Sequence, residues 1–194
     1  MPPVRVAVLA SGGGTNLQAL LDACGPDSPA RITRVVSNNA RAGALERARR
    51  AGVSAVVLHD PDDAREVLAA LADAEIVVLA GYLRLVPAPV VARFARRMIN
   101  IHPALLPAFG GPGMYGRRVH EAVLASGASE SGATVHFVDE HYDRGPVIAQ
   151  RTVPVRTGDT PETLAARILA VEHELLSQVV LDLARRLQSE GEIQ

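Results

Sequence analysis

Two side chains with catalytic potential stand where an apolar run ends in a proline-rich turn. Asn100 and His102 belong to the segment Asn-Ile-His-Pro-Ala-Leu-Leu-Pro, residues 100–107. Residues 97–99 before it predict a strand, and strand side chains alternate between two faces, so the pair shares one face. A carboxamide can stabilise an oxyanion, and an imidazole can move a proton near neutral pH. A histidine that merely caps the turn is the alternative.

A glycine-rich turn supplies a second candidate site. Residues 11–16 read Ser-Gly-Gly-Gly-Thr-Asn and link a predicted strand to a predicted helix. Glycine permits close backbone approach, and the start of the helix presents free N–H groups, so together they suit a phosphate. The Thr15 hydroxyl and the Asn16 amide add donors. A tight turn without a ligand is the alternative.

Two common phosphate-binding motifs do not fit this turn. The Gly-Lys-Ser/Thr that completes a P-loop does not follow the glycines. The second predicted strand ends at residues 36–39, Val-Ser-Asn-Asn, without the carboxylate that holds the ribose in a dinucleotide fold. The pattern therefore favours a smaller phosphorylated substrate over hydride transfer.

A third polar group lies in residues 139–146, Asp-Glu-His-Tyr-Asp-Arg-Gly-Pro. This loop holds three carboxylates. If it closes over the strand end that carries His102, one carboxylate can orient the imidazole and raise its pKa. An acidic hairpin loop exposed to solvent is the alternative, because sequence spacing does not show the contact.

Short apolar strands that alternate with helices must position these groups. The alternation predicts an α/β fold with a single doubly wound, mostly parallel sheet. Residues 133–138 and 146–155 predict a β-hairpin, and a long C-terminal helix is expected to start at Thr160 and Pro161. The other predicted strands are residues 4–10, 31–37, 53–58 and 75–80, and the other predicted helices are residues 16–24, 43–51, 61–72, 87–97 and 117–126.

Bulk composition limits the classes of protein that fit. The 194 residues suit one domain, residues 1–194. A formal net charge of −1 argues against a nucleic-acid partner. No secretory pattern or membrane-length apolar stretch occurs, so we expect a cytoplasmic protein. Cys24 is the only cysteine and is expected to pack at a helix end, and no metal-ligand cluster is recognisable.

Four motifs occur in order along the chain: residues 11–16, 78–84 (Val-Leu-Ala-Gly-Tyr-Leu-Arg), 100–107 and 136–146 (His-Phe-Val-Asp-Glu-His-Tyr-Asp-Arg-Gly-Pro). Their combination resembles the phosphoribosylglycinamide formyltransferases, folate-dependent enzymes of purine biosynthesis, over essentially the whole chain. The resemblance implies a Rossmann-like formyltransferase fold. It also implies transfer of a formyl group from 10-formyltetrahydrofolate to the amine of glycinamide ribonucleotide, with no metal. Ala104, where the family often has serine, and a longer loop at residues 109–116 depart from the pattern.

The resemblance also assigns roles to residues. It makes Asn100, His102 and Asp143 the catalytic trio. The residues that it implies for binding the ribonucleotide are Gly14, Thr15 and Asn16 for the phosphate and Glu172 for the ribose. Those that it implies for binding the folate are Arg65, Leu83, Arg84, Leu85, Val86, Asn100, Asp139, Glu140, His141, Tyr142 and Asp143.

Three other functions stay open. Methionyl-tRNA formyltransferase shares the folate motif but needs a tRNA-binding domain, whereas this chain ends at Gln194 without a basic patch. Formyltetrahydrofolate deformylase uses similar residues with water as acceptor, but it carries an N-terminal regulatory domain, and the first strand here begins at Val4. A non-enzymatic phosphate-binding module is the third. A monomer and a homodimer both stay open.

The remaining histidines receive structural interpretations. His59 and His120 are expected on the surface or in helix packing. His136 alternates with Thr134 and Val138 along one strand face, where it is expected to help shape the site.

Overall fold

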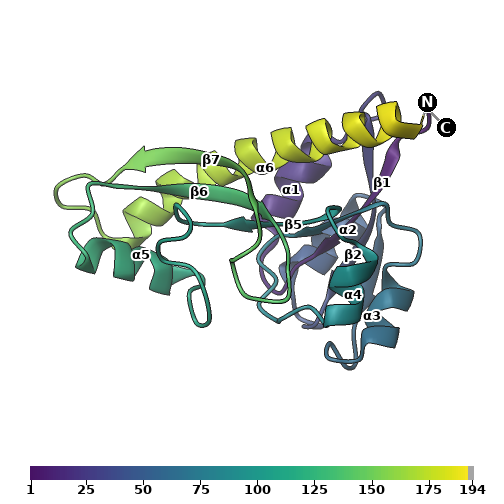
Figure 1. Ribbon diagram of the computed structural model, residues 1–194, viewed down its shortest axis with the longest axis horizontal. Helices are drawn as coiled ribbons and strands as arrows, with labels where there is room; N and C mark the ends of the chain where they lie inside the picture. The colour runs from purple at the N-terminus through teal and green to yellow at the C-terminus, as the bar shows by residue number, and fades with distance from the viewer. Residues whose placement is uncertain (192–194) are drawn as a thin grey trace.

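A sheet of seven strands runs through the molecule, with helices on both of its faces (Figure 1). The computed structural model describes residues 1–191, so the last three residues of the predicted domain 1–194 lie outside the described residues. The strands are β1 (Val4–Leu9), β2 (Ala30–Ser37), β3 (Ser54–Val57), β4 (Ile76–Leu79), β5 (Met98–His102), β6 (Glu130–Phe137) and β7 (Val147–Pro154). The helices are α1 (Thr15–Ala23), α2 (Gly43–Arg50), α3 (Ala64–Ala70), α4 (Ala88–Arg93), α5 (Arg117–Ala125) and α6 (Pro161–Gly191).

The strands follow the order β3-β2-β1-β4-β5-β6-β7 across the sheet. The first five of these are parallel, whereas β6 runs antiparallel to β5 and β7 antiparallel to β6. The Val, Ile and Leu residues of β1 and β4 are buried, as expected where crossover helices cover both faces of a parallel sheet. The predicted doubly wound, mostly parallel sheet with a hairpin and a long C-terminal helix is therefore confirmed.

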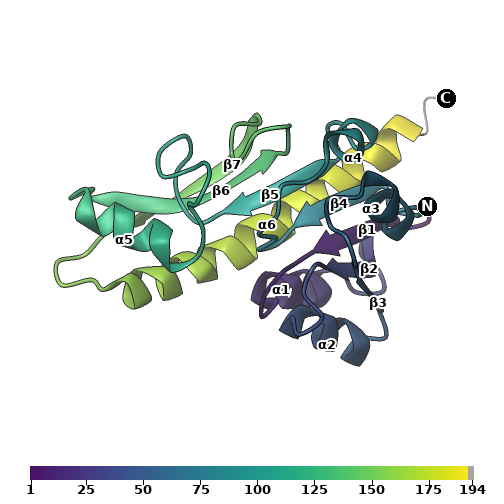
Figure 2. The same cartoon turned by 90° about the horizontal axis from the view of Figure 1, so that it is seen from below.

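Two apolar layers fill the space between the sheet and its helices. Val6 and Val8 of β1 belong to the layer that contains α1, α2 and α6. Ala7 and Leu9, which point the other way, belong to the layer that contains α3 and α4. Figure 2 shows α1 and α2 on one side of β1 and β2 and α3 and α4 on the other, with α6 extending along the sheet. Because successive side chains of a strand point to opposite faces of the sheet, β1 contributes residues to both apolar layers.

The helix α3 is shorter than the sequence predicts. It covers Ala64–Ala70, not residues 61–72. The Asp63 carboxylate caps it by accepting the Arg65 N–H at 2.9 Å. Because the cap fixes the start of the helix, Pro61 lies outside the first turn, and its predicted place inside that turn is wrong.

The helix α4 is also shorter, covering Ala88–Arg93 and not residues 87–97. Arg96 adopts a left-handed φ of 58°, which a continuing helix excludes. The Arg97 N–H then returns to the Phe94 carbonyl at 2.8 Å. A turn therefore ends the helix and aims the chain into β5, although helix-forming residues continue.

The helix α6 begins where the sequence predicts. Pro161 is its first residue, and the Thr160 hydroxyl accepts the Thr163 N–H at 3.3 Å. Although it is the longest helix of residues 1–191, neither α6 nor any other helix in that range is apolar enough over a sufficient length to cross a membrane.

Candidate active site

The carboxyl ends of β1, β4 and β5 meet at one edge of the sheet. The chain leaves β1 toward β2 and later returns to pair β4 with the other side of β1, so the winding direction reverses between β1 and β4. Ligands of open α/β sheets bind in the crevice at such a reversal. A cavity of about 490 Å³ lies there, within the usual size of a small-molecule site.

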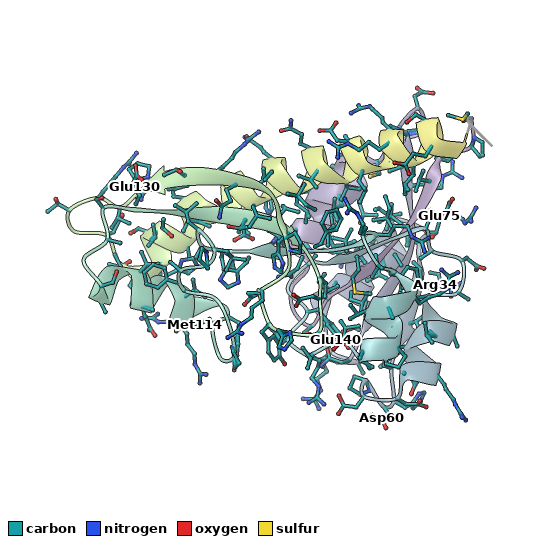
Figure 3. All side chains as sticks on the ribbon, in the orientation of Figure 1. Arg34, Asp60, Glu75, Met114, Glu130 and Glu140 are labelled. Carbon is teal, nitrogen blue, oxygen red and sulfur yellow. The ribbon has the colours of Figure 1, made fainter. Side chains whose placement is uncertain are left out.

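The cavity wall draws on both halves of the chain. Two loops project beside one another from the sheet and carry the residues labelled Met114 and Glu140 in Figure 3. Met114 lines the cavity, whereas Glu140 does not. Other elements that line it include the start of α1, residues 81–86 after β4, the end of β5, α5, β6 and the N-terminal half of α6.

The three predicted catalytic residues come together on this wall. Asn100 and His102 both line the cavity from β5, and Asp143 reaches it from the loop after β6. The distance from Asp143 Oδ1 to Asn100 Nδ2 is 3.4 Å, and that from Asp143 Oδ2 to His102 Nδ1 is 3.6 Å. The carboxylate thus faces the amide with one oxygen and the imidazole with the other.

The glycine-rich loop after β5 holds this arrangement. The Phe109 carbonyl lies 2.8 Å from His102 Nε2, and the Gly111 N–H donates to Asp143 Oδ2 at 2.9 Å. Phe109 and Asp143 each adopt a φ of 56°, a region that non-glycine residues rarely occupy. A Cβ at Gly110 would lie 2.5 Å from the Leu106 side chain and 3.1 Å from Asp143 Cβ, so a larger residue there would displace its neighbours. The loop of residues 109–116 therefore helps to hold His102 and Asp143 in place.

Burial and charge act in opposite directions on the two titratable members of the trio. Burial lowers the pKa of His102 below its ordinary value, and the Asp143 carboxylate and the Phe109 carbonyl offset only part of that effect. Burial alone would raise the pKa of Asp143, but the polar ring of His136, the charge of His102 and the Gly111 N–H together lower it. Asp143 is thus held as a carboxylate. Burial makes the neighbouring His102 imidazole harder to protonate.

The glycine turn leads into α1 on the same edge of the sheet. Gly14 adopts a φ of 76°, and a Cβ there would lie 2.7 Å from Ala44 Cα, so packing against α2 requires glycine. A Cβ at Gly12 or Gly13 would meet no such neighbour, so packing does not require glycine at either position. Arg47 of α2 donates from Nε to the Gly13 carbonyl at 2.8 Å and brings positive charge to the turn.

A buried polar pair joins the glycine turn to α6. Asn16 Nδ2 donates to Glu172 Oε2 at 2.7 Å, and both side chains line the cavity. Burial raises the pKa of Glu172, although the bond from Asn16 opposes the shift. Asn16 Oδ1 is buried without a partner among the described residues, so it is available to a ligand donor.

Most of the predicted folate residues line the cavity. Leu83 and Leu85 are 50% and 43% exposed and form an apolar mouth. Arg84 pairs with Asp62 at 2.5 Å. Arg65 is exposed on α3 and Glu140 is exposed on its loop, and neither lines the cavity. The predicted residues that do line it are Leu83, Arg84, Leu85, Val86, Asn100, Asp139, His141, Tyr142 and Asp143.

Two further histidines, His120 and His136, line the cavity. His120 lines the cavity from α5 and is 5% exposed, so its expected place on the surface is wrong, and only its packing on a helix fits. Burial lowers its pKa, and Nδ1 has no partner among the described residues. His136 lines the cavity from β6, as its strand face suggests. A lone histidine in a helix gives no sequence signal of such a position.

Cys24 takes no part in the site. It caps the end of α1, packs on the apolar layer and does not line the cavity. Burial raises the pKa of its thiol to about 11, which keeps it protonated and unreactive near neutral pH.

Taken together, the residues that line the cavity offer hydrogen-bond donors and a proton-transfer group beside an apolar cleft. This arrangement is suited to a reaction between two bound substrates.

The sequence matches a known family over most of its length. Residues 4–180 match the formyl transferase family. A chloroplastic phosphoribosylglycinamide formyltransferase of Vigna unguiculata is 45% identical over 185 residues, which are 91% of this chain and 59% of the relative. The phosphoribosylglycinamide formyltransferase of Escherichia coli (strain K12) is 38% identical over 186 residues, covering 91% and 85%. The chain thus spans less than two thirds of the plant relative and most of the bacterial one.

The fold is similar to solved structures as well. The phosphoribosylglycinamide formyltransferase from Anaplasma phagocytophilum superposes with a TM-score of 0.88 at 38% identity, covering 95% of this chain and 88% of that one. Glycinamide ribonucleotide transformylase 1 from Symbiobacterium toebii gives a TM-score of 0.85 at 44% identity, covering 94% and 88%. Both superpositions cover nearly the whole chain.

Proposed function

The chain belongs to the formyl transferase family, and we propose that it transfers the formyl group of 10-formyltetrahydrofolate to the primary amine of glycinamide ribonucleotide, in purine biosynthesis. The observation that carries the proposal is the Asp143 carboxylate set between Asn100 and His102 on the cavity wall. The relatives named for this reaction support the choice of acceptor.

The reaction requires no covalent bond to the protein. The substrate amine attacks the formyl carbon, a C–N bond forms, and negative charge collects on the formyl oxygen. The bond from the formyl carbon to N10 of the folate then breaks. N10 gains a proton, the attacking amine loses one, and the products are the formylated ribonucleotide and tetrahydrofolate. What the protein must supply is alignment, charge stabilisation and proton transfer.

Each member of the trio suits one of these tasks. Asn100 and protonated His102 donate hydrogen bonds to the developing oxyanion, and His102 passes a proton toward the leaving N10. Loss of one such donor typically costs about 2.7–4 kcal/mol of transition-state stabilisation. Asp143 favours the imidazolium form of His102 and orders the proton transfer, because its carboxylate lies 3.6 Å from His102 Nδ1.

The two substrates would occupy opposite ends of the cavity. The phosphate of the ribonucleotide would bind the backbone N–H groups of Gly14, Thr15 and Asn16 at the start of α1, where the helix dipole favours an anion. Of these three residues, Asn16 lines the cavity. The buried Glu172 carboxylate suits a pair of ribose hydroxyl groups. The apolar mouth around Leu83 suits the flat ring of the folate.

An acceptor comparison tests the proposal. The protein is mixed with 10-formyltetrahydrofolate and either glycinamide ribonucleotide, methionyl-tRNA or water alone, and formylated product and tetrahydrofolate are measured. We expect rapid transfer to the ribonucleotide and little reaction with the other two. Preference for methionyl-tRNA would instead indicate a methionyl-tRNA formyltransferase, and preference for water a formyltetrahydrofolate deformylase. No reaction with any acceptor would favour a non-enzymatic phosphate-binding module.

The domain and the compartment are part of the proposal. Residues 1–194 are proposed to work as one formyltransferase domain, and the cavity supports this because it takes walls from both α1 and α6. The cytoplasm is proposed as its compartment. A stable, active fragment lacking α6 would contradict the domain, and recovery from another cell fraction would contradict the compartment.

A further inference from the structure

A buried histidine that contacts Asn100 has no task in the reaction described above. His136 lies on β6 directly opposite Asn100 of β5 and is 2% exposed. Its Nε2 lies 3.0 Å from Asn100 Nδ2, and its Nδ1 lies 2.8 Å from the Phe137 carbonyl oxygen. Building on the proposed formyl transfer, we propose that His136 is a positioning residue that fixes which way the Asn100 amide faces.

The partners of the ring determine its tautomer. A carbonyl oxygen only accepts hydrogen bonds, so His136 Nδ1 must carry the proton that it donates to Phe137. In a neutral imidazole the other nitrogen is then an acceptor. His136 Nε2 therefore needs a donor, and Asn100 Nδ2 is within hydrogen-bond distance. Asp143 Oδ1, at 3.6 Å from Nε2, belongs to a carboxylate and only accepts hydrogen bonds, so it cannot replace this donor.

This tautomer determines the orientation of the amide. One N–H of Asn100 Nδ2 donates to His136, and the second is left to point toward Asp143 Oδ1, which lies at the longer distance of 3.4 Å. A formyl oxygen that enters beside Asp143 would find this second N–H available as a donor, because its bond to the carboxylate is long. His136 thus provides the active site with a donor already aimed at the reacting atom.

The opposite orientation is unfavourable for a simple reason. If the amide turned over, Asn100 Oδ1 would face the acceptor nitrogen of His136 and the carboxylate of Asp143. Both contacts would join two acceptors, and in a buried site an unsatisfied pair of this kind is costly. The oxyanion would then meet an oxygen where it needs an N–H. His136 prevents this by its lone pair, without touching substrate.

A double-mutant cycle tests the proposal through kcat and KM. His136→Phe keeps a ring but has no acceptor, His136→Gln keeps an acceptor on a longer arm, and Asn100→Ala removes the amide itself. We expect His136→Phe to lower kcat about 10–100-fold, with KM changed by less than about threefold. His136→Gln should have a kcat about tenfold higher than that of His136→Phe. In the Asn100→Ala background, His136→Phe should lower kcat less than about twofold. An equal loss in both backgrounds would overturn the proposal.

The tautomer of the wild-type protein gives a readout that does not depend on mutant folding or on turnover. Long-range ¹⁵N–¹H correlation of histidine-labelled protein, with His136→Gln used for assignment, reports which ring nitrogen carries the proton. We expect His136 to be protonated at Nδ1 and bare at Nε2. Protonation at Nε2 would overturn the proposal even in a fully active enzyme. Failure of the formyl-transfer function would instead appear in the acceptor comparison.

Discussion

Asp143 and His102 influence one another's charge, so the proposed mechanism makes the activity depend on pH. His102 must be protonated to act as an acid, so the rate falls as pH rises through its pKa, which burial holds below the ordinary value. Asp143 is the neighbour that offsets this lowering most. Its removal should therefore lower the pKa of His102 further.

The matching prediction concerns Asp143→Asn. This variant should lower kcat/KM about 100-fold near neutral pH, and the decline of activity with rising pH should shift to lower pH. The full pH profile of kcat/KM for both proteins measures this. An unshifted decline would show that the carboxylate does not act through His102.

A second prediction isolates the amide donor. Asn100 is only half buried, so Asn100→Ala should leave the melting temperature within a few degrees of wild type. It should lower kcat about 10²–10³-fold, the loss expected for one oxyanion donor. Steady-state kinetics with thermal unfolding of the same sample separates the two effects. A wild-type kcat would remove Asn100 from the catalytic group.

Sequence periodicity was enough to pair Asn100 with His102, because strand side chains repeat every two residues. It was not enough to select Asp143 from three carboxylates in its loop. That choice depends on a left-handed φ of 56° and on the pairing of β5 with β6, which are properties of the folded chain. Only the resemblance to a known family identified this residue in advance.

Among the elements, the glycine turn shows how packing and ligand access are divided between neighbouring residues. Gly14 is required by its φ of 76° and by the close approach of α2, whereas a Cβ added at Gly12 would meet nothing within 4 Å. Steric requirement thus explains Gly14 but not Gly12 and Gly13, for which the proposed phosphate site offers a reason. Three adjacent glycines looked alike in the sequence, because the position of α2 was unknown.

The variants Gly14→Ala and Gly12→Ala test this division. Gly14→Ala should lower the free energy of unfolding by about 1–3 kcal/mol, because it adds both a strained φ and a clash with Ala44. Gly12→Ala is the matched control and should change it by less than about 0.5 kcal/mol. Urea unfolding of both variants measures the difference. Equal destabilisation would contradict the steric account.

The strand and helix order of the chain was readable because each element has its own apolar period and turn residues. The ends of α3 and α4 were not, since a side-chain cap at Asp63 and the left-handed Arg96 decide them. The sequence also did not reveal that the 109–116 loop supports His102 and Asp143. Those contacts use backbone groups, which every residue possesses.

At the scale of the whole molecule, the buried Glu172 lowers the stability of the folded state at neutral pH, and we propose that it is kept to bind the ribonucleotide. Burial raises its pKa above the unfolded value, so the folded state is favoured at low pH and loses that contribution as pH rises through the folded pKa. A carboxylate kept at such a cost suits a ligand-binding role. The arrangement also joins α6 to the glycine turn across 156 positions of sequence, a contact that no local pattern predicts.

Glu172→Gln should accordingly be more stable than wild type at neutral pH, by about 2–6 °C in melting temperature, and this gain should vanish as pH falls to about 4. The KM for glycinamide ribonucleotide should rise at least about tenfold. Glu174→Gln, on the same helix but exposed, is the control and should change neither. A destabilised Glu172→Gln at neutral pH would contradict the account.

The central claim is that Asn100, His102 and Asp143 together transfer a formyl group between two bound substrates. Single-turnover measurement of transfer from labelled 10-formyltetrahydrofolate to glycinamide ribonucleotide tests it most directly, with wild type beside Asn100→Ala, His102→Ala and Asp143→Asn. We predict rapid transfer by wild type and a rate constant at least about 100-fold lower in each variant, with folate binding retained. Transfer at the wild-type rate in any two variants would contradict the claim.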